Sequence, residues 1–125
     1  MRLLIVENEP GIALVIEDVA IDAGFQITGI AGNMSEALEL GSAADIAIID
    51  VRLGDGITGP SIARALFSKF GLGVVYFTVN PGLTKDPEGR AVATKPARPE
   101  RIVDALSMAA KNASRRERAH LPLNA

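Results

Sequence analysis

The chain has 125 residues with no cysteine, and 48% of its residues are hydrophobic while 22% are charged. This length and composition favour one domain with a substantial core, and they exclude a fully disordered chain, disulfides, thiolate zinc sites and cysteine nucleophiles. The formal net charge of −2 divides into −5 over residues 1–110 and +3 over residues 111–125, so the domain is a poor binder of nucleic acid on electrostatic grounds.

Short apolar runs alternate with segments of helical periodicity, a pattern typical of βαβ units around a parallel sheet. Nearly continuous apolar runs at 2–6, 46–49 and 74–77 predict three central strands that are covered on both faces. Weaker apolar segments at 25–31 and 91–94 predict two edge strands. The sheet should therefore have five strands.

Between the first two strands, a helix is expected to begin near Pro10 and to end at Gly24. Its apolar positions recur at the spacing of one helical stripe. The residues predicted to face inward are Ile12, Val15, Ile16, Val19, Ala20 and Ala23. Leu14 and Ile21 fall off this stripe, and Val103 falls off the stripe of the last helix. These three are either a partner-facing patch or ordinary exposed apolar residues.

Two further helices are predicted between the second and fourth strands. The first of them should begin at about Met34, because Asn33 and Glu36 have the spacing of a capping box. The next should have Thr58 as its N-cap and should stop at Gly71. Its apolar positions are Ile62, Ala63, Leu66, Phe67 and Phe70.

The segment 80–89 contains two prolines and two glycines, so we expect at most one or two helical turns there. A final helix should begin at Pro99. Right-handed crossovers then favour a doubly wound α/β fold, with a five-stranded parallel sheet in the order 2-1-3-4-5 and a shortened fourth helix. Residues 1–112 would form the domain, and residues 113–125 a basic tail that either extends the last helix or is disordered.

Polar side chains gather where the predicted strands end. In an open parallel sheet, ligands bind outside the carboxyl ends of the strands. The residues at these ends are Glu7, Asn8, Glu9, Asp50, Thr78 and Lys95. Two carboxylates about 4 Å apart repel by roughly 4 kcal/mol at an effective dielectric near 20, so Glu7 and Asp50 need a cation, for which Mg²⁺ is suited. Asp50 is then a candidate nucleophile toward phosphorus, with Thr78 and Lys95 holding the phosphoryl oxygens.

Each of these residues also has a purely structural interpretation. Asp50 can be a turn former after an apolar strand, and Glu7 and Glu9 can be acids favoured by the dipole of the following helix. Thr78 can be a β-branched residue that ends a strand, and Lys95 a surface lysine at a turn. The functional interpretation is favoured because the structural one requires that several unrelated polar residues lie at the same edge of the sheet by chance.

The motifs LIVENEP, IIDVRL, FTV and TKP, in this order, resemble the receiver domain of bacterial two-component response regulators. The resemblance covers residues 2 to about 110 and is nearest to stress-response and stand-alone receivers. It implies a flavodoxin-like fold with Asp50 as phosphoacceptor, Thr78 as switch hydroxyl and Lys95 as phosphate-contacting lysine. It also implies Mg²⁺ as cofactor, a cis bond between Lys95 and Pro96, and as metal ligands Glu7, Asn8, Asp50 and the backbone carbonyl of Arg52.

The sequence departs from the receiver pattern at three positions. Asn8 stands where receivers usually have a metal-binding aspartate, which should weaken Mg²⁺ binding; Glu9 is expected to compensate in part. Val92 occupies the position of the usual switch aromatic, and Val79 replaces a small residue after Thr78.

The resemblance favours a single-domain response regulator that accepts a phosphoryl group from a histidine kinase or phosphotransfer protein and signals through protein contacts, and it is compatible with a homodimer. We expect a cytoplasmic protein with no membrane or nucleic-acid partner, and no enzyme beyond assisting its own phosphorylation and dephosphorylation. The alternative is a pseudo-receiver, an interaction module independent of phosphorylation. A small flavodoxin-like enzyme or nucleotide binder is disfavoured because the chain has no phosphate-binding loop motif and no tryptophan.

Two other features are predicted to be structural. The glycines Gly54, Gly56 and Gly59 do not form a phosphate-binding loop and indicate a tight turn followed by a helix start. The single histidine, His120, lies in the tail and is expected to be solvated.

Overall fold

The structure is a computed structural model that describes residues 1–79, 91–95 and 98–119, without the side chains of 91–93 and 114–119. The predicted segment 80–89, the bond between Lys95 and Pro96, and His120 lie outside the described residues. In chain order the elements are β1 (Arg2–Val6), α1 (Pro10–Asp22), β2 (Gln26–Ala31), α2 (Met34–Gly41), β3 (Ile46–Ile49), α3 (Gly59–Phe70), β4 (Gly73–Thr78), β5 (Ala91–Thr94) and α4 (Pro99–Ala119).

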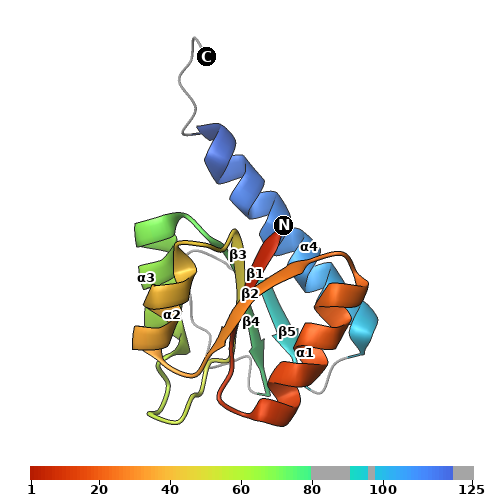
Figure 1. The fold of residues 1–125 in the computed structure, drawn as a ribbon, viewed down its shortest axis with the longest axis vertical. Coiled ribbons are helices and arrows are strands. Elements are labelled where there is room, and N and C mark those ends of the chain that lie inside the picture. Colours follow the sequence, from red (N-terminus) through yellow and green to blue (C-terminus); the bar gives the residue numbers. More distant parts are fainter. Residues whose placement is uncertain (80–90, 96–97, 120–125) are drawn as a thin grey trace.

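The five strands form one parallel sheet in the order β2-β1-β3-β4-β5, as the sequence predicts (Figure 1). The register aligns the carboxyl ends of β1, β2 and β3, where Val6 pairs with both Ala31 and Ile49. The strands β4 and β5 end together at the pair of Thr78 and Thr94, two residues further along the same edge. Residues that directly follow the strands therefore emerge at one edge of the sheet. The α/β, doubly wound architecture is confirmed.

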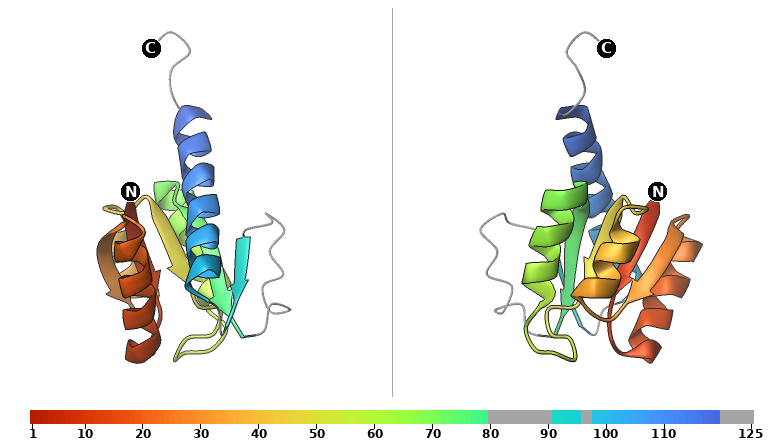
Figure 2. Two further views of the ribbon diagram at one scale, coloured as in Figure 1. Left: turned by 90° about the vertical axis from the view of Figure 1, so that its right-hand side faces the viewer. Right: turned by 60° about the vertical axis from the view of Figure 1, so that its left-hand side comes forward.

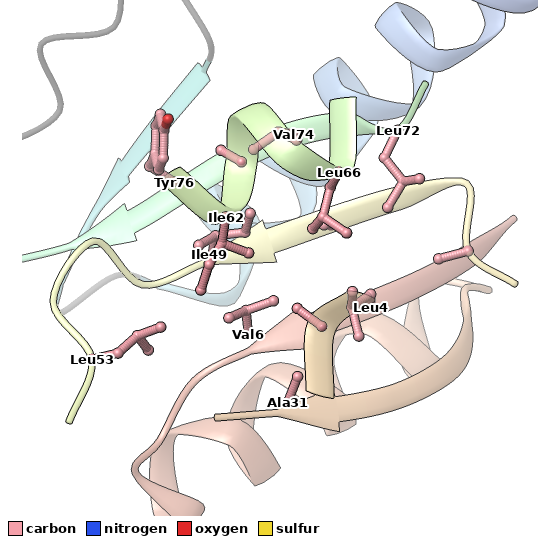
Figure 3. Close-up of a cluster of buried hydrophobic side chains, with 14 of the residues drawn as sticks. Leu4, Val6, Ala31, Ile49, Leu53, Ile62, Leu66, Leu72, Val74 and Tyr76 are labelled. Carbon is pink, nitrogen blue, oxygen red and sulfur yellow. The ribbon is translucent and has the colours of Figure 1, made fainter. Parts of the chain in front are cut away.

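Helices cover both faces of the sheet, with α1 and α4 on one face and α2 and α3 on the other (Figures 1 and 2). Alternate residues of the central strands point to opposite faces, so Ile48 packs under α1 and α4 while Ile49 packs under α2 and α3. Figure 3 shows the cluster of buried side chains on the face that α2 and α3 cover, where Ile62 and Leu66 of α3 pack against the sheet. Because both faces are covered, the central strands are apolar throughout.

The buried side of α1 differs from the predicted stripe. Val15, expected to face inward, is 55% exposed, whereas Ala13 is buried together with Ile16 and Ala20. Alanines at positions 13 and 20 let the helix backbone approach the sheet closely, so the helix turns this narrow side inward. Apolar periodicity alone does not distinguish a side of small residues from a neighbouring side of large ones.

The helix ends agree with the predictions in part. Asn33 caps α2, since its side-chain oxygen accepts a hydrogen bond of 2.9 Å from the Glu36 backbone N–H, and α3 ends at Gly71 with a φ of 69°. Thr58 is the N-cap residue of α3, as predicted, but its side chain makes no cap hydrogen bond, and its hydroxyl donates to Asp55 Oδ1 at 2.7 Å. The backbone of Thr58 has φ −103° and ψ −9°, in the right-handed helical region, and not the extended conformation that is typical of a side-chain cap.

The last helix, α4, continues to Ala119, so residues 113–119 of the predicted basic tail extend the helix, which is one of the two forms expected for that tail. Its C-terminal turns extend past the end of the sheet (Figure 2). None of the helices in the described parts of the chain combines the length and apolar character that crossing a bilayer requires.

An ion pair joins the starts of β1 and β3. Asp45 Oδ2 accepts hydrogen bonds from the Arg2 backbone N–H at 2.8 Å and from its Nε at 3.4 Å, and the Asp45 N–H donates to the Arg2 carbonyl at 2.9 Å. Burial raises the pKa of Asp45, but the bonds from Arg2 outweigh this effect and hold the pKa below its ordinary value.

We expect Asp45→Asn to lower the free energy of unfolding by about 1 kcal/mol at neutral pH, a small value because both side chains are partly exposed. A lowered folded-state pKa stabilises the fold above the unfolded value of 3.8, and this stabilisation is lost as pH falls through the folded value. The wild type and the variant should therefore converge below about pH 4 in urea unfolding. Asp104→Asn, on an exposed part of α4, serves as control. Equal stability of Asp45→Asn and wild type at neutral pH would contradict the prediction.

Candidate functional site

Three charged side chains meet at the carboxyl edge of the sheet. Glu7 directly follows β1, Asp50 follows β3 and Lys95 follows β5, so the parallel register brings together residues far apart in the sequence. Lys95 Nζ lies 2.9 Å from Glu7 Oε2 and 3.1 Å from Asp50 Oδ2. One ammonium group thus bridges the two carboxylates.

The bridge is largely shielded from solvent. The exposed fraction of the side chain is 11% for Lys95, 1% for Glu7 and 12% for Asp50. At such separations and an effective dielectric near 20, each attraction is worth roughly 5 kcal/mol, against a desolvation cost of several kcal/mol per ion. The site depends most on Lys95, because removing this lysine leaves both carboxylates shielded from solvent without a counter-charge, whereas removing one carboxylate leaves the other paired with Lys95.

Each carboxylate also accepts a backbone hydrogen bond on its second oxygen. Glu7 Oε1 accepts from the Glu9 N–H at 3.2 Å, and Asp50 Oδ1 accepts from the Arg52 N–H at 3.3 Å. These bonds fix the orientation of both carboxyl groups. The Lys95 ammonium additionally lies 5.3 Å from the ring centroid of Phe77, a distance compatible with a cation–π contact.

The environment shifts two of the pKa values at the site. Burial raises the pKa of Glu7, and the nearby Asp50 charge adds to this effect, while Lys95 opposes it. For Lys95, burial alone would lower the pKa, but hydrogen bonds and charge attraction from Glu7 and Asp50 outweigh it and raise the pKa above its ordinary value. Lys95 therefore stays cationic at neutral pH.

The remaining predicted residues lie around these ion pairs. Thr78 ends β4; it is buried, and its carbonyl accepts the Lys95 N–H at 2.8 Å. Asn8 is exposed, and its amide nitrogen would lie 3.3 Å from a Cβ added to Gly54 in the loop after β3. Glu9 is exposed at the start of α1. Arg52 reaches Asp50 through its N–H, and the predicted role of its carbonyl as a metal ligand stays a prediction.

Sequence reasoning missed the part that Gly59 plays in the site. The Gly59 N–H donates to the Val51 carbonyl at 3.0 Å, and a Cβ at Gly59 would overlap the Asp50 carbonyl oxygen and come within 2.6 Å of Val51 Cα. The first residue of α3 thus packs directly on the backbone of Asp50. The sequence indicates a turn and a helix start at this glycine, whereas its contact with the backbone of Asp50 and Val51 is visible only in the structure.

The donor set suits a hard divalent cation in part. Glu7 and Asp50 converge on one cationic group, so their oxygens are within reach of a common ion, and Mg²⁺ commonly uses one or two protein carboxylates. Within the described ranges, no cluster of three or more Asp, Glu, His or Cys side chains has metal-site geometry. The residues fit an ion that completes its shell with water, amide or phosphate oxygens.

Comparison with known proteins supports the class that this fold and this set of strand-end residues define. No family model matches the chain. Its fold gives a TM-score of 0.79 with the receiver domain of the PhyR response regulator of Erythrobacter litoralis, at 29% identity over 86% of this chain and 88% of that one. The resemblance to response-regulator receiver domains is confirmed.

Two longer relatives are also named PhyR. The chain is 29% identical over 127 residues to the phyllosphere-induced regulator PhyR of Methylorubrum extorquens, covering 95% of this chain and 48% of that protein. It also gives a TM-score of 0.83 with the anti-anti-sigma factor PhyR of Bartonella quintana, at 26% identity over 96% of this chain and 51% of that one. The chain spans about half the length of these two relatives.

We expect Lys95→Met to lower the free energy of unfolding by about 2–4 kcal/mol at neutral pH, because Glu7 and Asp50 would remain close together without their shared cation. Glu7→Gln in the Lys95→Met background should recover part of the loss by removing one of the two charges. Chemical denaturation measures both effects, with Lys69→Met on an exposed part of α3 as control. A Lys95→Met protein as stable as wild type would show that the bridge does not hold the site together.

Proposed function

We propose that the chain is a single-domain response-regulator receiver that accepts a phosphoryl group on Asp50. The observation that supports this proposal is the contact of one lysine with both Glu7 and Asp50 at the carboxyl edge of a receiver fold. The phosphoryl donor would be a histidine kinase or a phosphotransfer protein in the cytoplasm. The chain itself would be no enzyme beyond assisting its own phosphorylation and dephosphorylation.

In the proposed reaction, a carboxylate oxygen of Asp50 forms a bond to phosphorus while the bond from phosphorus to the donor histidine nitrogen breaks. The electron pair of the broken bond stays on that nitrogen. Glu7, Asp50, the Asn8 amide and the Arg52 carbonyl would hold Mg²⁺, which would neutralise charge on the transferred group. The Arg52 N–H already fixes one oxygen of Asp50, so the carboxylate is oriented before the donor arrives.

Phosphorylation would change the partners of Lys95. The aspartyl phosphate carries up to about two negative charges and several strong acceptor oxygens, so it attracts the ammonium away from the carboxylate contacts of the resting state. The Lys95 N–H is bonded to the Thr78 carbonyl, which links the ends of β4 and β5. A movement of Lys95 toward the phosphoryl group, together with the Thr78 hydroxyl, would bias the neighbouring loops toward a closed state.

The output would be a protein contact. One relative is described as an anti-anti-sigma factor and another as a response regulator, so both names concern regulation. We propose a comparable regulatory role here, with a downstream protein as the partner and a homodimer as a compatible state.

A second candidate function is a pseudo-receiver that binds partners without phosphorylation. Two observations favour it: Asn8 stands where receivers usually have an aspartate, and Lys95 already supplies a positive charge to both carboxylates. With such a built-in cation, the fold balances its acidic edge without a metal. The two candidates differ in whether Asp50 is chemically reactive.

We expect incubation with acetyl phosphate and Mg²⁺ to add about 80 daltons to the wild-type protein, the mass of one phosphoryl unit transferred to a carboxylate oxygen of Asp50 as acetate leaves. Asp50→Asn should show no gain, and Asp55→Asn, which alters a neighbouring carboxylate in the same loop, should still gain the unit. Intact-mass spectrometry reads all three proteins. Absence of a gain in the wild type would favour the pseudo-receiver, and a gain in Asp50→Asn would refute the assigned acceptor.

We expect Asn8→Asp to strengthen Mg²⁺ binding by about tenfold, because it adds one carboxylate beside Glu7 and Asp50. Calorimetric titration, or amide shifts around Asp50 during addition of Mg²⁺, measures the change. Asn112→Asp adds the same charge on an exposed part of α4 and should leave Mg²⁺ affinity unchanged. Equal affinity of Asn8→Asp and wild type would remove position 8 from the metal site.

A further inference from the structure

The ring of Phe77 lies beside the charged side chains of the candidate site. Phe77 is the penultimate residue of β4, and its partner in the register with the neighbouring strand β5 is Ala93. Lys95 comes two residues after Ala93, so it lies diagonally across from Phe77. The register therefore brings the lysine to the ring, whose centroid is 5.3 Å from Lys95 Nζ.

The Lys95 ammonium makes three favourable contacts at once. Two of its three N–H groups donate to Glu7 Oε2 and Asp50 Oδ2. The third contact is with the Phe77 ring, whose π face attracts a cation within about 6 Å of the centroid. Because only 11% of the Lys95 side chain is exposed, water competes little for the ammonium, and the attraction to the ring is stronger than at an open surface.

The ring is held in place by the core. Phe77 is 5% exposed and belongs to the cluster of buried residues that α1 and α4 cover, together with Ile5 and Ile102. A ring in a close-packed interior keeps one rotamer, whereas a lysine has a flexible stem of four carbons. At this edge of the sheet, the ring is therefore the fixed surface and the ammonium is the group that can move.

The ring that contacts Lys95 comes from β4. Val92 of β5 stands at the position of the usual switch aromatic, so the chain has an aliphatic residue there. Phe77 instead precedes Thr78 on the neighbouring strand, and its contact with Lys95 was not predicted from the sequence. An aromatic side chain is thus present at the site, although it is supplied by a different strand.

We propose that Phe77 is a positioning residue, whose ring holds the Lys95 ammonium beside Asp50 before and after a phosphoryl group arrives. This inference rests on the proposed function, in which Lys95 moves from the carboxylates toward the phosphoryl oxygens. Hydrogen bonds to the carboxylates must break during that movement, because each requires a particular direction and distance. The attraction to the ring face is less directional, so it persists and keeps the ammonium close to the acceptor.

The contact itself can be measured by NMR on the full chain. A ring current shifts protons above an aromatic face upfield, so the ε-methylene protons of Lys95 should lie upfield of those of Lys69, which is exposed on α3. Phe77→Leu keeps an apolar side chain in the core and should remove this difference. Equal shifts for the two lysines in the wild type, or an upfield shift that survives Phe77→Leu, would overturn the inference.

The electronic character of the ring can be separated from its size. Pentafluorophenylalanine at position 77 keeps nearly the shape of the ring but reverses the charge of its face. The rate at which acetyl phosphate and Mg²⁺ phosphorylate Asp50, followed by intact mass, should fall about three- to tenfold. The same replacement at Phe70, exposed at the end of α3, should leave the rate unchanged. A fluorinated ring at position 77 that supports the wild-type rate would contradict a positioning role.

A double-mutant cycle tests the contact without phosphorylation. In urea unfolding, the fluorinated ring should lower the ratio of folded to unfolded protein about threefold more when Lys95 is present than in the Lys95→Met background. A ring that only fills the core would have the same effect in both backgrounds, and this result would refute the inference. A wild-type protein that gains no phosphoryl group would refute the proposed function, while the NMR and urea measurements would still show whether the ring holds Lys95.

Discussion

The bridge from Lys95 to Glu7 and Asp50 is the interaction on which the candidate site depends. It joins the ends of three strands that are distant in the sequence, and it does so where the sheet would otherwise concentrate negative charge. The lysine can make both contacts because β5 pairs with β4 and ends at the same edge of the sheet as β1 and β3, two residues beyond the level of Val6 and Ile49. The register of the sheet thus determines whether Lys95 can balance the charge of the two carboxylates.

Much of this arrangement follows from the sequence. Apolar strands separated by amphipathic helices define a doubly wound sheet, and the alignment of parallel strand ends then places Glu7, Asp50 and Lys95 at one edge. The contacts themselves do not follow, because they depend on side-chain reach across the sheet. The same limit explains Val15 and Thr58: the rotation of a helix depends on the size of the facing residues, and a side-chain cap depends on the backbone conformation of the capping residue.

Position 8 affects the net charge of the site, because Asn8 is neutral where receivers usually have an aspartate. Two carboxylates and one ammonium carry a net charge of −1 when Glu7 and Asp50 are ionised, whereas a third carboxylate at position 8 would make this edge more negative. The chain therefore depends less on an external cation to tolerate its buried acids.

The close packing of Gly59 on the backbone of Asp50 and Val51 has a mechanical consequence. Because Gly59 has no side chain, no atom lies between the Asp50 backbone and the start of α3 to absorb a displacement. A shift of the Asp50 peptide would therefore press directly on the first residue of that helix. That helix carries Ile62 and Leu66 into the core on the far side of the sheet from α4. A displacement of the Asp50 backbone would thereby be passed, through direct contact, to the face of the sheet that α3 covers.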